Sequence, residues 1–289
     1  MTGNSTQQPC FPQALEDKTC LFQGNHTWDQ VSQSNIYYQT IEDEDILSKY
    51  SEERIREMPE RFSMVELGTG AFEKIAILLD KVRAQKKYCF CLVVDISRKA
   101  LKQQVDKLSA RYKSYAGIQV RGYQEDLCSA HLRLEEIPGI LYVISLGSVL
   151  LNDEFPEDRL RPYAHLLQRR PGSVLHISQD ASTTMNSAEI MRPYGQMVYL
   201  EFIRRAISEF DGFSPDEWDL DHLMVYEPLL HHAFRLKGKG AQAGKEYLFF
   251  RSYKITKDMV EEMTSNQGLF ILKAYESSRM SEPSSRNYP

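Results

Sequence analysis

The sequence has no apolar run long enough to cross a bilayer, and its first residues lack the apolar segment of a signal peptide. It also lacks an excess of positive charge, because 35 Lys and Arg stand against 40 Asp and Glu. Nucleic acids and anionic membranes attract basic proteins, so neither is an expected partner of a chain with a net charge of −5. We therefore expect a cytoplasmic protein that binds neither nucleic acid nor membranes.

Cysteine is scarce as well. The five cysteines are odd in number and show no C-x-x-C spacing, which argues against a disulfide framework. Cys89 and Cys91 stand two apart in an apolar run, so we expect them to share one strand face as buried, reduced thiols. His231 and His232 are adjacent and would point to opposite faces of a strand, and no third ligand stands at a suitable spacing. No metal site is predicted.

What the sequence does contain is a strand, a glycine turn and a helix in direct succession within residues 62–80. The apolar run 64–67 leads into Gly68 and Gly70, after which apolar residues recur at helical spacing. This arrangement holds nucleotides at the edge of doubly wound sheets, because glycine lets a ligand approach the backbone closely. Glu73 occupies the place of the third glycine of the dinucleotide fingerprint, so a nucleotide other than NAD is favoured.

The remainder of the chain predicts an α/β, Rossmann-like doubly wound sheet followed by a smaller α+β part. Up to residue 180 apolar strands alternate with helices, and the strands are expected at 64–67, 88–95, 118–123, 140–146 and 173–178. After residue 180 the expected elements are a long helix near 187–210, antiparallel strands at 230–236 and 246–252, a helix at 256–264 and a strand at 269–275.

Two carboxylates stand near the glycine turn. Asp95 ends the apolar strand that follows the turn, where a carboxylate binds ribose hydroxyls in folds of this kind. The alternative for Asp95 is a solvated aspartate at a strand end, but the strength of the apolar run favours ribose binding. Glu66 precedes Gly68 and either caps its own loop or contacts a cationic group of the ligand.

The residues around the glycine turn resemble a known family. The run Val65-Glu-Leu-Gly-Thr-Gly70, together with Val94-Asp95, is similar to the cofactor motifs of class I S-adenosylmethionine-dependent methyltransferases. Further motifs resemble the histidine Nα-methyltransferase of ergothioneine biosynthesis and, equally, the fungal dimethylallyltryptophan N-methyltransferase. These motifs are Leu21-Phe22, Trp28-Asp29, Tyr37-Tyr38-Gln-Thr40, Glu42, Ile46-Leu47, Glu73-Lys74, Leu146-Gly-Ser-Val-Leu-Leu-Asn152 and Ser252-Tyr-Lys254.

The resemblance implies that S-adenosylmethionine is the cofactor. Gly68, Lys74 and Asp95 match family positions that hold the methionine part and the ribose of the cofactor. Tyr123-Gln124 occupies the place of an Asp-Phe pair beside the adenine. Together with the glycine turn, the resemblance predicts these cofactor-binding residues: Glu66, Gly68, Gly70, Lys74, Asp95, Tyr123, Gln124 and Ser148.

The resemblance also implies a substrate side. Tyr37 matches a tyrosine that lines the substrate, and Asn152 matches the asparagine that grips the amino-acid backbone of the substrate; both are predicted to be catalytic. Ser252 matches a substrate-side serine. Apart from the resemblance, Tyr194 or Tyr199 is a further candidate to line the pocket and relay a proton. In the histidine enzyme a carboxylate two residues before that serine reads the imidazole, and here that position is Phe250. Because a phenyl ring cannot accept the imidazole N–H, we expect an aromatic or apolar amine rather than histidine.

The predicted organisation is a substrate-binding part of residues 1–57 and 181–253 and a cofactor-binding part of residues 58–180 and 254–289, with a disordered tail from about residue 277. The predicted function is N-methylation of a small amine derived from an amino acid, in secondary metabolism such as alkaloid biosynthesis, by a monomer or homodimer. The alternative is a catalytically silent homologue that senses the cofactor or binds a protein through an incomplete sheet edge.

Overall fold

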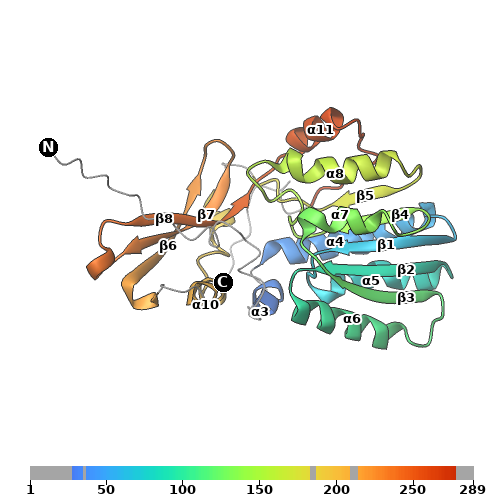
Figure 1. The fold of residues 1–289 in the computed structure, drawn as a ribbon, viewed down its shortest axis with the longest axis horizontal. Helices are drawn as coiled ribbons and strands as arrows, with labels where there is room; N and C mark the ends of the chain where they lie inside the picture. Colours follow the sequence, from blue (N-terminus) through green and yellow to red (C-terminus); the bar gives the residue numbers. More distant parts are fainter. Residues whose placement is uncertain (1–27, 35–36, 183–186, 209–213, 278–289) are drawn as a thin grey trace.

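The protein contains two sheets, which lie side by side (Figure 1). The structure, a computed structural model, describes residues 28–34, 37–182, 187–208 and 214–277. The predictions for the first residues of the chain, for Leu21-Phe22 and for the end of the tail lie outside the described residues. Within the described residues, no helix combines the length and the apolar character that crossing a membrane requires.

The larger sheet has five parallel strands in the order β3-β2-β1-β4-β5. Their bounds are β1 (Arg61–Leu67), β2 (Tyr88–Asp95), β3 (Ile118–Gln124), β4 (Leu141–Ser145) and β5 (Val174–Ile177). The predicted strands of this part, and the α/β doubly wound fold, are thus confirmed. The strand order reverses between β1 and β4, and in such sheets ligands bind outside the carboxyl ends of the strands at that reversal.

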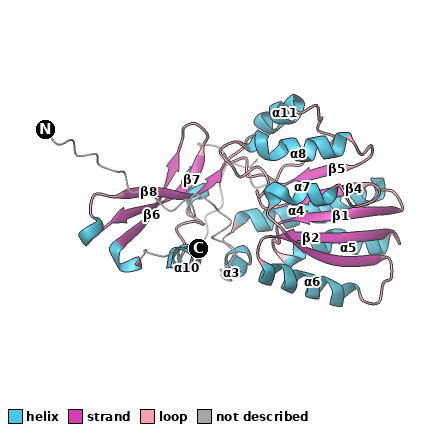
Figure 2. Cartoon of the chain, in the orientation of Figure 1, coloured by secondary structure: helices cyan, strands magenta, loops and turns pink. Residues whose placement is uncertain are grey.

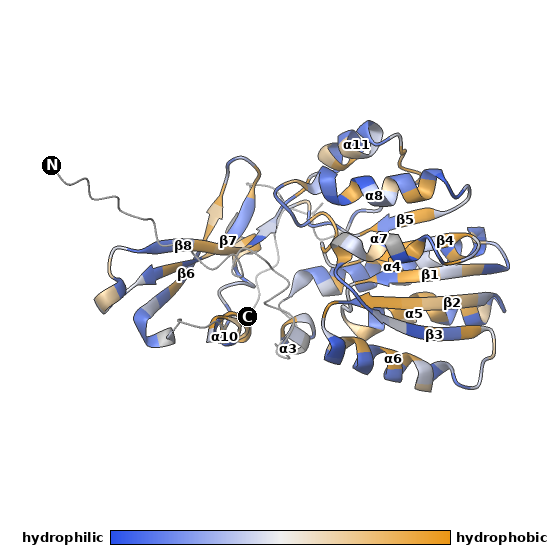
Figure 3. Ribbon diagram, in the orientation of Figure 1, coloured by the Kyte–Doolittle hydropathy of each residue, from blue (hydrophilic) through white to orange (hydrophobic). Residues whose placement is uncertain are grey.

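The central strands are apolar because both of their faces are covered. Every residue of β1 after Arg61 is buried, and hydrophobic residues are concentrated in β1, β2 and β4 (Figure 3). A parallel strand that is packed on both sides shows a continuous apolar run instead of alternation. Because of this continuous apolar run, the central strands could be predicted from the sequence.

Helices cover both faces of the parallel sheet (Figure 2). One face carries α4 (Tyr38–Glu57), α5 (Phe72–Ala84) and α6 (Arg98–Tyr112). The other face carries α7 (Leu127–Leu134), α8 (Pro156–Gln168) and α11 (Lys257–Asn266). The predicted division placed residues 1–57 with the substrate-binding part, whereas α4 packs onto this sheet through Leu47 and Ile55. The division into two parts stays a prediction.

The second part is built around the antiparallel sheet β6-β7-β8. Its elements, together with the short N-terminal helix that packs on it, are α3 (Trp28–Ser32), α9 (Ser187–Met191), α10 (Met197–Ser208), η2 (Pro215–Glu217), β6 (Trp218–Val225), β7 (His231–Gly238), η3 (Gly240–Gln242) and β8 (Glu246–Tyr253). The predicted antiparallel pairing of the two strands that became β7 and β8 is confirmed. Aromatic residues of α3, α10 and the sheet form the core of this part.

Two secondary-structure predictions were wrong, and two elements were not predicted. The long helix near 187–210 is two helices, because the chain turns after Met191 and Pro193 interrupts the pattern. Residues 269–275, where a strand was expected, pair with no strand among the described residues, and Phe270 is 81 % exposed. The apolar residues of this segment indicated a strand, but strand pairing also requires a neighbouring strand, which the local sequence pattern does not predict. The short α7 and the polar-rich β6 were not anticipated.

Candidate active site

The glycine turn lies at the carboxyl end of β1, next to the reversal of strand order. Gly68 adopts a φ of +80°, a left-handed conformation that side chains rarely take, and a Cβ there would stand 3.4 Å from Val149. Apart from its chain neighbours, none of the described residues has an atom within 4 Å of the place where a Cβ of Gly70 would stand. The turn therefore has open space above its second glycine, which fits the close approach of a cofactor to the backbone.

Asp95 ends β2 beside this turn. Its Oδ2 accepts hydrogen bonds from the backbone N–H and the hydroxyl of Thr69, both at 2.6 Å, and its Oδ1 accepts one from Ser97 N–H at 2.6 Å. Burial raises the pKa of Asp95, and these hydrogen bonds oppose that rise. The carboxylate is therefore fixed at the position predicted for ribose binding. Thr69 was not among the predicted site residues, although it lies between the two glycines of the turn.

Glu66 lies on the α6 side of β1 and is 2 % exposed. Gln104 Nε2 of α6 donates a hydrogen bond of 3.3 Å to its carboxyl group. Burial raises the pKa of Glu66 to about 8 although this hydrogen bond acts in the opposite direction. The side chain thus lies beneath the turn, in the helix layer that contains Gln104, and a contact to the cofactor stays a prediction.

Lys74, in the first turns of α5, forms a buried ion pair with Asp43 of α4 at 2.5 Å. Asp43 also accepts hydrogen bonds from Gly147 N–H, at 3.0 Å, and from the hydroxyl of Ser178. The sequence reading singled out Glu42, one residue away. A spacing of four identifies the buried residue, since Gln39, Asp43, Leu47, Ser51 and Ile55 all lie on the buried face of α4.

The predicted adenine pair lies beside Asp95 at the end of β3. Gln124 is the register partner of Asp95, and its Nε2 donates to Ile96 O at 3.2 Å. The guanidinium of Arg133 lies over the Tyr123 ring, 5.2 Å from its centroid. The acidic residue next in the chain, Glu125, accepts a hydrogen bond from the Ser129 hydroxyl of α7. Both predicted residues therefore lie at the carboxyl end of the parallel sheet beside Asp95, and their contact with adenine stays a prediction.

The loop 147–152, after β4, joins the two halves of the site. Val149 lies against the Gly68 position, and the Ser148 hydroxyl accepts a hydrogen bond from Asp180 N–H at 2.6 Å. Asn152 Oδ1 accepts one from Tyr253 N–H of β8 at 2.8 Å. This loop therefore brings the cofactor edge and the strand that bears the predicted substrate residues together.

A buried polar network connects two of the residues that were predicted to bind the substrate. Lys254 Nζ forms an ion pair with Asp180 at 2.6 Å and donates hydrogen bonds to Tyr194 Oη at 2.9 Å and to Ser252 Oγ at 3.1 Å. The two hydroxyls are 2.8 Å apart and bond to each other. Burial would raise the pKa of Asp180, but Lys254 and the hydroxyl donors outweigh this and hold the pKa at about 2. The sequence reading named Tyr194 and Ser252 but missed the ion pair that holds them.

Tyr37 connects to the same network. Its hydroxyl donates to Gln39 Oε1 at 2.8 Å, and Gln39 Nε2 donates to Asp180 at 2.9 Å. The neighbouring Tyr38 donates its hydroxyl directly to Asp180. The structure thus gathers the predicted substrate residues Tyr37, Asn152, Tyr194 and Ser252 around one end of the antiparallel sheet.

Aromatic rings pack around Tyr37. Edge-on and tilted ring contacts, with centroids 5.3 to 6.5 Å apart, link Trp28, Tyr37, Tyr38, Tyr199, Phe202, Phe234 and Phe250. Phe250 is 7 % exposed and has a φ of +47°, at a bulge-like irregularity in β8. The predicted substrate residue Phe250 therefore belongs to an aromatic cluster.

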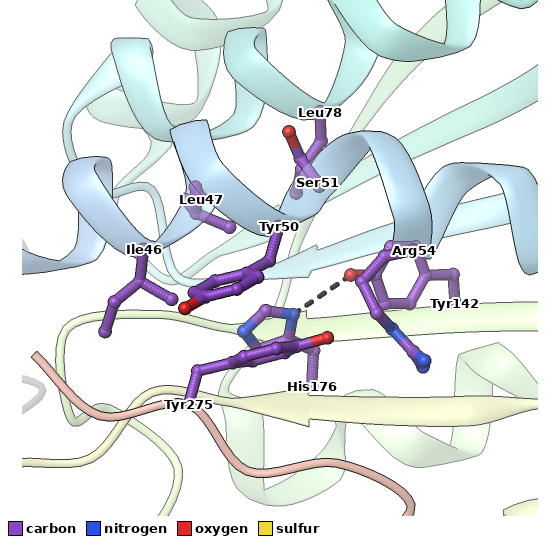
Figure 4. Close-up of a pocket in the computed structure, with 9 residues that line it drawn as sticks. All are labelled: Ile46, Leu47, Tyr50, Ser51, Arg54, Leu78, Tyr142, His176 and Tyr275. Atoms are coloured by element: carbon purple, nitrogen blue, oxygen red, sulfur yellow. Dashed lines mark hydrogen bonds between the residues drawn. The ribbon is translucent and has the colours of Figure 1, made fainter.

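Away from these residues, a crevice lies between α4 and the segment after α11 (Figure 4). Tyr275 stacks on Tyr50 with centroids 4.0 Å apart, and Tyr142 bonds to His176 at 3.0 Å beneath them. Burial lowers the pKa of His176 to about 4, so this imidazole is neutral at pH 7. Apart from His176, Ser51 and Arg54, its lining consists of aromatic and aliphatic side chains, and we interpret the crevice as a packing contact of the segment after α11. In the described residues, no group of three His, Cys, Asp or Glu side chains is placed to hold a metal ion.

Comparison with known proteins identifies the family to which this chain belongs. The chain matches the family described as histidine-specific methyltransferase, SAM-dependent, over residues 14–281. It is 28 % identical over 99 residues to N-methyltransferase dtpB of Aspergillus flavus, which covers 34 % of this chain and 28 % of the relative. It is 21 % identical over 277 residues to N-methyltransferase imqF of the same fungus, covering 87 % of this chain and 74 % of the relative.

A solved structure, the SAH-bound methyltransferase PaMTH1 of Podospora anserina, aligns at 11 % identity and a TM-score of 0.30, over 80 % of this chain and 89 % of that one. The family match covers most of the chain, from the segment before α3 to the residues after α11. The chain therefore belongs to this family of S-adenosylmethionine-dependent methyltransferases.

Proposed function

We propose that the protein transfers a methyl group from S-adenosylmethionine to the nitrogen of a small aromatic or apolar amine derived from an amino acid. One observation carries this proposal: the loop 147–152 contacts the glycine turn through Val149 and the substrate-side network through Ser148 and Asn152. Methyl transfer requires two bound molecules to meet at attack distance, and a single loop that contacts both halves of the site supports such a meeting.

The residues of the cofactor edge fit S-adenosylmethionine. Asp95 would accept the ribose hydroxyls, and the Lys74 ammonium would face the carboxylate of the methionine part. Gly68 and Gly70 would allow the cofactor to lie against the backbone, with Tyr123, Gln124 and Ser148 around it. The bound cofactor supplies an electrophilic methyl group on a sulfonium.

On the substrate side, the work of the residues is to hold a neutral amine and to exclude water. Asn152 would orient the amine or its neighbouring group, with Tyr37 and Tyr194 lining the pocket. Rings near the amine also favour a cationic ammonium product, because a cation is attracted to the face of an aromatic ring. The buried cluster around Tyr37 and Phe250 supports this part of the proposal.

Histidine is a poor fit to this pocket. Phe250, which stands where the resemblance implies an imidazole-reading carboxylate, packs against the rings of Phe202 and Phe234. A phenyl ring offers no acceptor for an imidazole N–H, and an unpaired buried donor costs about 1–3 kcal/mol. A phenyl or aliphatic side chain carries no N–H donor and therefore leaves no donor unpaired at this position.

The test is methyl transfer from labelled S-adenosylmethionine to a panel of L-tryptophan, tryptamine, L-phenylalanine, phenethylamine and L-histidine. We expect at least one aromatic amine to be N-methylated. Asn152→Ala should lower turnover about 100-fold while S-adenosylhomocysteine binding stays within about two-fold. Asn266→Ala, at the exposed end of α11, is the matched control.

Two outcomes would count against the proposal. Binding of S-adenosylhomocysteine without methylation of any amine in a widened panel would reject the activity. Full turnover by Asn152→Ala would leave the activity standing and remove Asn152 from the mechanism.

A further inference from the structure

Lys254 is a fully buried charge for which the proposed mechanism has no use. Its side chain is 0 % exposed, and that of its partner Asp180 is 2 % exposed. Burial would lower the pKa of Lys254, yet the fields of Tyr194 and Asp180 raise it, so the side chain stays an ammonium. Apolar residues of similar volume often fill such a position at no cost in stability, so the presence of the charge calls for another reason.

The carboxylate of Asp180 does not depend on Lys254 for its hydrogen bonds. Its Oδ2 accepts from the Tyr38 hydroxyl and from Gln39 Nε2, and its Oδ1 accepts from Ser182 through both the backbone N–H and the hydroxyl. The connection between α4 and the loop after β5 would therefore persist without the ammonium. What the ammonium alone contributes is its contact with Tyr194 and Ser252.

A count of protons shows what this contact does. An ammonium carries three N–H donors and cannot accept, so both hydroxyl oxygens must accept from Lys254. The Tyr194 and Ser252 hydroxyls then share one hydrogen bond between them, which uses one of their two protons. The second proton has no acceptor among the residues that the structure describes. The hydroxyl pair is left with one donor to offer.

We propose that Lys254 is a positioning residue that turns the Tyr194–Ser252 hydroxyl pair into a directed donor for an acceptor atom of the substrate, such as a carboxylate or carbonyl oxygen. The inference rests on the proposed function and deepens it. Lys254 does not touch the substrate in this account. It acts through the two hydroxyls, and the substrate must carry an acceptor near its amine.

Substrate choice follows from this role. L-tryptophan and tryptamine share an indole and an amine and differ in the carboxylate, so the pair isolates the acceptor. L-phenylalanine and phenethylamine repeat the comparison with a smaller ring. The wild-type protein should use the carboxylate-bearing member of a pair with a KM at least about 10-fold lower than that of the decarboxylated member.

The decisive variants remove the ammonium without stranding a charge. Lys254→Met together with Asp180→Asn neutralises both partners, because breaking one side alone would leave a buried charge unpaired and could prevent folding. We expect the KM for the carboxylate-bearing amine to rise at least about 10-fold, with S-adenosylhomocysteine affinity within about two-fold of the wild type. Lys257→Met, on the exposed face of α11, should change neither value.

A double-mutant cycle separates positioning from a structural effect. The cycle adds Lys254→Met/Asp180→Asn to a Tyr194→Phe/Ser252→Ala background, in which the hydroxyl pair is gone. If Lys254 acts through the pair, its removal should change KM by less than about two-fold there.

An equal rise of KM in both backgrounds, or a parallel loss of S-adenosylhomocysteine affinity, would overturn the inference. A wild-type protein that binds S-adenosylhomocysteine but methylates no amine would reject the proposed function and this inference with it. An active wild type whose KM is unmoved by Lys254→Met/Asp180→Asn would reject this inference alone.

Discussion

The two sides of the site each contain a buried lysine–aspartate pair, and the pairs differ in what they leave open. Lys254 on the substrate side uses all three ammonium protons on Asp180, Tyr194 and Ser252. Lys74 on the cofactor side donates to Asp43 at 2.5 Å, and the structure gives its ammonium no second acceptor within the described residues. We call Lys254–Asp180 the closed pair, because all three ammonium N–H groups donate to protein atoms. We call Lys74–Asp43 the open pair, because the Lys74 ammonium has N–H groups that donate to no described residue.

This difference separates a binding group from a positioning group. An ammonium with unused donors beside a glycine turn is suited to the carboxylate of a cofactor, since charge-assisted hydrogen bonds are the strong ones. An ammonium with every donor used can act only through the groups that it holds. We therefore expect changes at the cofactor edge to alter cofactor affinity, and changes at the Lys254 network to alter substrate affinity.

The largest expected effect concerns substrate choice at the aromatic cluster, which lies on the same side of the site as the closed pair. L-histidine should be methylated with a kcat/KM about 100-fold below that of the best aromatic amine, because the Phe250 position offers its imidazole no acceptor. Competition between the two amines in one reaction, read by mass spectrometry, measures the ratio directly. A preference for histidine would show that the aromatic cluster does not define the substrate pocket.

The next effect concerns cofactor affinity at Asp95, on the same side of the site as the open pair. Asp95→Ala should weaken S-adenosylhomocysteine binding about 30-fold, since it removes the charged acceptor proposed for two ribose hydroxyls, a loss of about 2 kcal/mol. Calorimetry gives the affinity, and Asp106→Ala on the exposed face of α6 is the matched control. Unchanged affinity in Asp95→Ala would place the ribose elsewhere.

A third effect is a pH dependence of stability at the cofactor edge. Burial raises the pKa of Glu66 from 4.5 to about 8, so the folded protein keeps a proton that the unfolded chain releases. The free energy of unfolding should therefore fall as the pH rises from 4.5 to about 8, by at most about 1.4 kcal/mol per pKa unit.

Glu66→Gln cannot ionise, so its stability advantage over the wild type should grow across this window and then level off. Thermal unfolding of both proteins between pH values of about 5 and 9 measures this advantage. Glu52→Gln, whose parent side chain is 63 % exposed, should track the wild type. Parallel pH profiles for Glu66→Gln and the wild type would show that Glu66 is ionised in the folded protein.

The smallest effect should arise outside both sides of the site. Tyr275→Ala removes the ring that stacks on Tyr50 and should cost about 1 kcal/mol of stability, with methyl transfer and cofactor affinity unchanged. Phe270→Ala, whose parent side chain is 81 % exposed, should stay within about 0.5 kcal/mol. Loss of activity in Tyr275→Ala would give the crevice in Figure 4 a functional role.

The cofactor edge could be predicted because its signal is local. A strand, two glycines and a helix follow one another within residues 62–80, and Asp95 is marked by the apolar strand that it ends. Asp43 was not predicted, although the spacing of four along the buried face of α4 would have identified it. Lys74 was identified from the resemblance, but its pairing with Asp43 joins two helices and no local pattern encodes it.

The substrate side could not be assembled from local patterns. Asp180 meets Lys254 across 74 positions of sequence and Tyr38 across 142. Such contacts depend on how the two sheets are placed relative to each other, and the hydrophobic periodicity of the sequence does not predict that placement. The strand expected at 269–275 failed for a related reason, because pairing requires an edge partner as well as an apolar run.

The difference between the open and the closed pair is tested most directly by S-adenosylhomocysteine calorimetry on three proteins: the wild type, Lys74→Met/Asp43→Asn and Lys254→Met/Asp180→Asn. Both variants neutralise a buried pair, so neither leaves a buried charge unpaired. We predict wild-type affinity in the Lys254 variant and a loss of at least about 10-fold in the Lys74 variant. Equal losses in both variants, or a loss confined to the Lys254 variant, would contradict the account.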